Sequence, residues 1–210
     1  MTWFKGGKSA VWICCLGLLF SAVSLEAQYF KPFTGLKVIR TARFDLIYPE
    51  ASAKTAETLA GFADALYDRV SMLLQTSYPA RIPVVISPHT DQFNGLTTTL
   101  PAISILLFDT VMEPEWTSFT NTLEGLFIHE LTHALSLSSK SPFFKGLHRV
   151  FGGWVYPVAL NAPLFMAEGA AVSFESLDGS GRARDPLVRG TLIQAVHENK
   201  FLSPFQVSGV

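Results

Sequence analysis

Charge is scarce in this sequence, and basic charge is never clustered. Only 16% of the 210 residues are charged, the formal net charge is −1, and no two Lys or Arg residues are adjacent. A nucleic-acid-binding surface needs a dense basic patch, so the composition excludes nucleic acid as a partner. Hydrophobic residues make up 49% of the chain, which is far more than an intrinsically disordered protein contains.

Cysteine is nearly absent. The chain has two cysteines, Cys14 and Cys15, and both lie in an uncharged stretch at residues 10–25. The region that follows has none, which excludes a domain held together by disulfides. An exported protein without disulfides is typical of a bacterial periplasm or cell envelope.

A secretory signal peptide is predicted for residues 1–27. Two lysines precede the uncharged stretch, and the tripeptide Leu-Glu-Ala ends at Ala27, immediately before Gln28. The competing interpretation is a membrane anchor, but the 16 residues of the stretch fall short of the roughly 20 that a membrane span needs. We therefore expect an exported chain with one domain over residues 28–210.

Hydrophobic periodicity predicts the elements of the first half of this domain. They are a strand or hairpin at residues 36–48, a helix at 50–75, a strand at 82–87, a polar loop at 88–102 and a strand at 103–109. The helix carries an apolar stripe at spacings of three and four, made of Leu59, Phe62, Leu66, Val70 and Leu73.

The second half predicts helices at residues 121–138, 164–176 and 186–199. The first of them is apolar on most faces, which is typical of a buried helix. Strands early and helices late indicate an α+β fold, with a small mixed sheet packed beside a helical half.

An uncharged run occupies residues 150–167. Glycine, proline and asparagine residues interrupt it, so a membrane span is a poor interpretation. A buried or interfacial segment is favoured. If the segment is interfacial, residues 143–166 are expected to contact a membrane surface.

The segment His129-Glu130-Leu131-Thr132-His133 carries the clearest chemical signal. Residues four apart on a helix lie on one face, so both imidazoles can bind the same metal ion. The intervening glutamate lies near that ion and is free to hold a water molecule. This is the H-E-x-x-H pattern of zinc-dependent peptidases.

A catalytic zinc site normally has a third protein ligand. The metzincin pattern would place it soon after the second histidine, but Ser136 and Ser139 occupy the required Gly and His positions. Glu168 is the best candidate, since a lone carboxylate in the small-residue helix Ala167-Glu168-Gly169-Ala170-Ala171 needs a partner. The remaining candidates for this third ligand are Glu175, His148 and His197.

The sequence HELTH, followed by the later helix PLFMAEGAAV, resembles the gluzincin metallopeptidases, and most closely their peptidase MA-like group from bacterial envelope proteins. The resemblance covers roughly residues 40–200 and includes the expected strands and long helix upstream. It implies a thermolysin-like fold and a zinc ion held by His129, His133 and Glu168. It differs in the longer spacing before Glu168 and in the absence of a GAMEN-type exopeptidase motif.

The resemblance also implies roles for other groups. Glu130 would take a proton from the attacking water and pass it to the leaving amine. Gluzincins use a Tyr or His to stabilise the oxyanion, for which the candidates are Tyr156, His148 and His197. The strand at residues 103–108 either borders the cleft and pairs with an extended peptide substrate, or is an ordinary interior strand.

The sequence thus predicts an exported zinc-dependent peptidase, of endopeptidase type, that acts on a peptide or protein substrate. The alternative is a zinc-binding or degenerate peptidase-like interaction module of the cell envelope. Similar proteins often carry this domain ahead of β-propeller repeats, so we expect the domain to be C-terminally incomplete, with a β-propeller or other domain missing from this chain.

Overall fold

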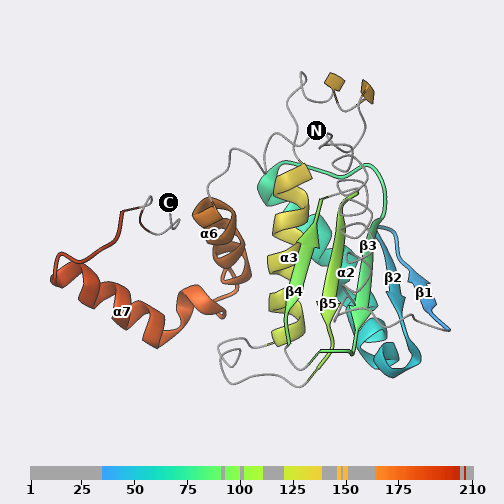
Figure 1. The fold of residues 1–210 in the computed structure, drawn as a ribbon, viewed down its shortest axis with the longest axis horizontal. Helices are drawn as coiled ribbons and strands as arrows, with labels where there is room; N and C mark the ends of the chain where they lie inside the picture. Colours follow the sequence, from blue (N-terminus) through green and yellow to red (C-terminus); the bar gives the residue numbers. More distant parts are fainter. Residues whose placement is uncertain are drawn as a thin grey trace, which may run out of the picture. The chain divides into compact units, whose positions relative to one another are not determined.

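The computed structural model describes residues 35–90, 93–99, 102–110, 121–138, 146–147, 149–150, 164–203 and 206. The chain divides into two units, residues 1–33 and residues 34–210. The predicted signal peptide and most of the uncharged run lie outside the described residues. Within the second unit, the described residues form the predicted α+β arrangement, with a five-stranded mixed sheet and four α-helices (Figure 1).

The sheet has the strand order β1-β2-β3-β5-β4. Its strands are β1 (Lys37–Arg40), β2 (Phe44–Tyr48), β3 (Ile82–Ser87), β4 (Gly95–Thr98) and β5 (Ser104–Phe108). The three central strands are parallel, and the two outer strands run antiparallel to their neighbours. Of the two possibilities for residues 36–48, a strand or a hairpin, the structure shows the hairpin, formed by β1 and β2, and its buried side chains in β2 are Phe44, Leu46 and Tyr48.

At the far edge of the sheet the structure corrects the loop prediction and decides between the two interpretations of the strand at residues 103–108. Residues 88–102 are not all loop, because β4 lies within them and pairs with β5. Its four residues, Gly-Leu-Thr-Thr, are too short and too polar to show strand periodicity, and β5 sets their conformation through backbone pairing. The strand at 103–108 is an ordinary interior strand, the second of the two alternatives, because β3 pairs with it on one side and β4 on the other, which leaves no edge for a peptide.

The long helix expected at residues 50–75 is confirmed as a 3-10 turn, η1 (Glu50–Ser52), followed by α2 (Ala53–Leu74). It ends at Gln75, which adopts a left-handed conformation with φ of 51°. The buried side chains of α2 are those of Ala56, Leu59, Ala63, Leu66, Tyr67 and Val70. Leu73 was expected among them but is 47% exposed, because the 3.6-residue period continues from Val70 to Leu74, which packs on the core.

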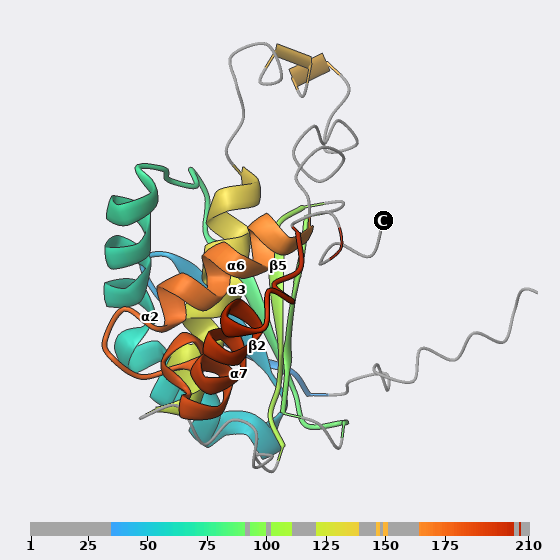
Figure 2. The same ribbon diagram turned by 90° about the vertical axis from the view of Figure 1, so that its left-hand side faces the viewer.

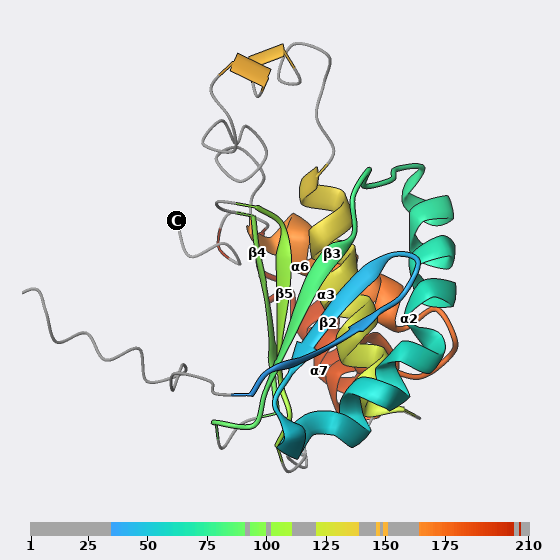
Figure 3. The same ribbon diagram turned by 90° about the vertical axis from the view of Figure 1, so that its right-hand side faces the viewer.

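The remaining helices are α3 (Thr122–Ser138), α6 (Leu164–Glu175) and α7 (Pro186–His197), close to the predicted ranges. Figures 2 and 3 show α2 and α3 on the same face of the sheet. Every residue of α3 from 125 to 135 is buried, as the sequence predicted for this helix. No helix in the described part of the chain combines the length and the apolar character that crossing a membrane requires.

An aromatic pair fixes the rotation of α3 against the sheet. Phe127 is fully buried, and its ring meets the ring of Phe44 on β2 edge-on, with 5.2 Å between centroids. Such pairs contribute about 0.5–1.5 kcal/mol beyond the burial of area. With Phe127 toward the sheet, His129 and His133 face α6, and Glu130 faces β4.

Candidate metal centre

Two imidazoles of α3 lie side by side, as the spacing of His129 and His133 predicts. Their Nε2 atoms are 3.1 Å apart, and the planes of the two rings are nearly perpendicular. Both residues are buried, with 6% and 9% of their surfaces exposed. The two nitrogen atoms therefore point at one small space next to α6.

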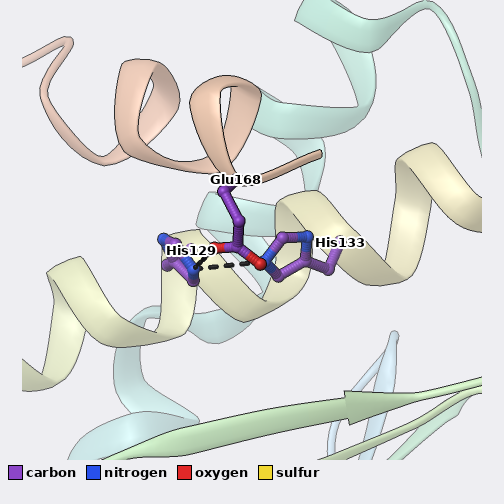
Figure 4. Close-up of side chains that lie close together, drawn as sticks. All are labelled: His129, His133 and Glu168. Atoms are coloured by element: carbon purple, nitrogen blue, oxygen red, sulfur yellow. Dashed lines mark hydrogen bonds and ion pairs between the residues drawn. The ribbon is translucent and has the colours of Figure 1, made fainter. Parts of the chain in front are cut away.

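The third group at this space is Glu168, which α6 supplies (Figure 4). Its Oε2 atom lies 3.4 Å from Nε2 of His129, and its Oε1 atom lies 3.5 Å from Nε2 of His133. The Glu168 side chain is 48% exposed, so the group is covered by α3 on one side and reachable from solvent on the other. This is the residue that the sequence favoured as the third ligand.

The separations suit a single metal ion. His129, His133 and Glu168 each offer a ligand atom, and these atoms all lie within 4.8 Å of one another. Nitrogen and oxygen atoms that bind one tetrahedral ion at about 2.0–2.1 Å are roughly 3.3 Å apart. The two imidazole nitrogens are separated by 3.1 Å, and each lies 3.4 or 3.5 Å from one of the two Glu168 oxygens. Two imidazoles and a carboxylate can therefore hold a metal ion here without a change in the backbone.

Glu175 holds the outer nitrogen of His129. Its Oε2 atom lies 2.8 Å from Nδ1 of His129, and its side chain is completely buried. An imidazole that donates its Nδ1 proton to a carboxylate keeps the lone pair of Nε2 for a metal ion. Glu175, which the sequence offered as an alternative third ligand, is thus not a member of the converging group but a partner of one member.

Arg182 balances the buried charge of Glu175. Its Nε and Nη2 atoms lie 2.7 Å from Oε1 and Oε2 of the carboxylate, a two-pronged ion pair. Nη2 also lies 2.7 Å from Nδ1 of His129. Since a guanidinium only donates, Nη2 and a protonated Nδ1 both direct their hydrogens to Oε2.

The turn after α6 returns the chain so that Arg182 meets Glu175. Gly181 adopts φ of +88°, and a Cβ there would lie 2.6 Å from Oγ of Ser176 and 2.9 Å from the carbonyl oxygen of Glu175. Only glycine fits this conformation and this close approach without strain. The residue immediately after it then lies against the carboxylate.

The electrostatic environment favours the protonation states that a metal site needs. Burial, together with the charge of His129, lowers the pKa of His133, so the neutral, metal-binding imidazole is favoured. Burial also acts to raise the pKa of Glu175, but the hydrogen bonds from Arg182 and His129 outweigh it, and the pKa lies below its ordinary value. Glu175 is therefore an anion despite its burial.

Glu130 is not a member of the converging group, and its carboxylate lies against β4. Its carboxylate Oε2 accepts a hydrogen bond of 2.7 Å from the Thr97 hydroxyl, and the residue is 4% exposed. Burial raises the pKa of Glu130, against the lowering effect of the hydrogen bond from Thr97. A carboxylate with a raised pKa beside a metal site is suited to accepting a proton.

The other predicted site residues are not in this cluster or are not described. Tyr156 and His148 lie outside the described residues. His197 is in the last turn of α7, where it lines a shallow apolar depression with Leu192, Ile193 and Val196. Of the small residues that follow Glu168 in α6, Ala171 is buried, whereas Gly169 is exposed and a Cβ there would meet nothing within 4 Å.

Sequence reasoning missed three residues around the site, Arg182, Thr97 and Gly95. Arg182 had no usable signal, because its approach to Glu175, seven residues earlier, depends on the turn at Gly181. Thr97 and Gly95 had none, since β4 was not recognised as a strand.

Comparison with known proteins gives a likeness to part of a longer protein. No family model and no solved structure matches the chain. An uncharacterized protein of Treponema pallidum (strain Nichols) is 38% identical over 166 residues, which are 77% of this chain. The matched region is only 14% of that relative, so the chain spans a small part of its length.

Proposed function

We propose that this chain is an exported zinc-dependent peptidase of the gluzincin type, with the thermolysin-like fold of that group. The observation that carries the proposal is the convergence of His129, His133 and Glu168, with separations of 3.1, 3.4 and 3.5 Å. Two imidazoles and one carboxylate are the ligand set of many catalytic zinc sites. When bound, zinc lowers the pKa of a water molecule and polarises the carbonyl group to be cleaved.

Glu130 moves the proton in this proposal. It follows His129 directly in α3, so its carboxylate is next to the metal centre without belonging to the converging group. Its raised pKa and its burial allow it to take a proton from the attacking water and to deliver that proton to the leaving amine. Such general-base assistance is worth roughly 10²–10⁴ in rate.

The substrate we propose is an extended peptide lying along β4. This strand is the last in the order of the sheet, and no described strand lies beyond it. It also contacts Glu130 through Thr97, so a peptide along this edge would lie near the residue that we propose as the proton acceptor. A peptide that adds to an edge strand is held by main-chain hydrogen bonds, so its backbone would be aligned with the catalytic groups.

The test is digestion of an unbiased peptide library by the zinc-loaded protein and by its Glu130→Gln variant, with zinc content measured on the same preparations. We expect cleavage by the wild type, a loss of at least about 10²-fold in the variant, and equal zinc in both. Equal cleavage by both proteins would exclude the mechanism. Zinc binding without cleavage of any peptide would favour the alternative, a zinc-binding interaction module.

A further inference from the structure

Two side-chain positions of β4 face the carboxylate of Glu130. Alternate residues of a strand point to the same face, and in β4 the face toward α3 is occupied by Gly95 and Thr97. The intervening Leu96 lies between them on the opposite face and is 56% exposed. Both positions that meet Glu130 therefore come from a single four-residue edge strand.

Because Gly95 has no side chain, the side chain of Glu130 can occupy the space next to it. A Cβ at this position would lie 2.6 Å from Cγ, 2.8 Å from Oε1 and 2.9 Å from Cδ of Glu130. These distances are shorter than a van der Waals contact, so any other residue would displace the carboxylate. The end of a glutamate side chain is flexible, and we expect the carboxylate to move rather than the strand.

Thr97 contacts both the side chain and the backbone of Glu130. Its Oγ1 atom lies 2.7 Å from Oε2 of Glu130 and 2.8 Å from the backbone carbonyl oxygen of the same residue. A hydroxyl that contacts both the carboxylate and the backbone carbonyl of one glutamate restricts the rotamer of that glutamate. Thr97 thus keeps the carboxylate close to the backbone of Glu130 itself, against β4.

We propose that Gly95 and Thr97 are positioning residues that set the place of the Glu130 carboxylate for catalysis. The inference rests on the proposed function, in which Glu130 is the proton acceptor. Proton transfer needs the acceptor within hydrogen-bonding reach of the reacting group, and a displacement of 1 Å can cost about 100-fold in rate. The edge strand therefore sets the rate of the reaction as well as offering a surface for the peptide.

The first measurement is steady-state hydrolysis of a peptide found in the library digest. Thr97→Val keeps the shape of the side chain but removes the hydroxyl, and Gly95→Ala adds the obstructing methyl group. Both should lower kcat by about 10- to 100-fold and leave KM and zinc content unchanged. Thr97→Ser should restore kcat, and Gly61→Ala, at a position with no neighbour within 4 Å, should match the wild type.

The second measurement needs no substrate. Carbon-13 in the side-chain carboxyl groups of glutamate gives one NMR resonance per residue, and the Glu130 resonance is the one missing from Glu130→Gln. In the zinc-loaded protein it should shift in Thr97→Val and Gly95→Ala and stay in place in Gly61→Ala.

The two measurements separate failure of this inference from failure of the proposed function. If the wild type cleaves no peptide, the peptidase proposal fails, and the NMR shifts alone decide whether Gly95 and Thr97 place the carboxylate. If the wild type cleaves but Thr97→Val and Gly95→Ala keep its kcat, the positioning role is overturned. An unmoved Glu130 resonance in both variants would overturn it as well.

Discussion

The Nδ1 atom of His129 lies 2.8 Å from Oε2 of Glu175, and that carboxylate is completely buried. A buried anion is costly unless it is paired, and here it is paired twice, with the imidazole and with Arg182. The contact sets the tautomer of His129 and turns its Nε2 atom toward His133 and Glu168. His129 is far from Glu175 and Arg182 in the sequence, but the three residues contact one another and form one polar unit.

Replacing Arg182 should destabilise the protein. Arg182→Met leaves the buried Glu175 carboxylate without its cation, which for a fully buried pair costs roughly 3–5 kcal/mol. The loss should be smaller here because the Arg182 side chain is 35% exposed. Urea unfolding of the metal-free protein measures it, with Arg184→Met in the same 3-10 turn (Arg182–Arg184) as the matched control. Equal midpoints for the two variants would contradict the role of the pair.

Replacing Glu175 should weaken metal binding without removing a ligand. Glu175→Gln keeps an oxygen atom for the Nδ1 proton of His129 but loses the charge that supports it. Partners of this kind are worth about 10–100-fold in metal affinity. Competition with a chelator measures the zinc dissociation constant, and Glu198→Gln, at an exposed carboxylate beyond α7, provides the control. An unchanged constant in Glu175→Gln would show that the contact does not orient the imidazole.

Replacing Glu168 should be more severe, because it removes a direct ligand. We expect Glu168→Ala to lose more zinc affinity than Glu175→Gln, and to do so with little effect on folding, since half of the Glu168 side chain is exposed. Circular dichroism and metal analysis on the same sample test both parts. Stoichiometric zinc retained by Glu168→Ala would mean that another residue is the third ligand.

Export is predicted from residues that lie outside the described structure. If residues 1–27 are a signal peptide, the protein recovered from the periplasm or medium should begin at Gln28 or within a few residues of it. N-terminal sequencing of the exported protein tests this. Recovery of the chain with Met1 intact from a cytoplasmic fraction would contradict it.

The sequence predicts the elements of this fold best where periodicity is strong. The stripe of α2, the alternation of β2 and the mostly apolar faces of α3 were each long enough to identify, and the structure confirms the three elements, with Leu73 as the exposed exception in α2. Strand β4 was missed because Gly-Leu-Thr-Thr has no pattern of its own and becomes a strand only through pairing with β5. That omission also left open whether the strand at residues 103–108 is interior, which the structure shows it to be.

For the site, too, the sequence predicts what local spacing determines and misses what depends on tertiary packing. The spacing of His129 and His133 is local, so helix geometry alone predicts that they converge. The choice of Glu168 over Glu175 was correct for the converging group, but the role of Glu175 depends on how α6 turns against α3. Arg182 reaches Glu175 through the tight turn at Gly181, a tertiary contact that no spacing in the sequence reveals.

The most direct test of the metal centre is a crystal structure of the zinc-loaded protein with anomalous diffraction recorded at the zinc absorption edge. We predict one strong anomalous peak, within about 2.0–2.2 Å of Nε2 of His129, Nε2 of His133 and a carboxylate oxygen of Glu168. Glu130 should lie outside that coordination distance, with its hydrogen bond to Thr97 retained. A zinc peak bound by other residues, or no peak in the space between α3 and α6, would contradict the central claim.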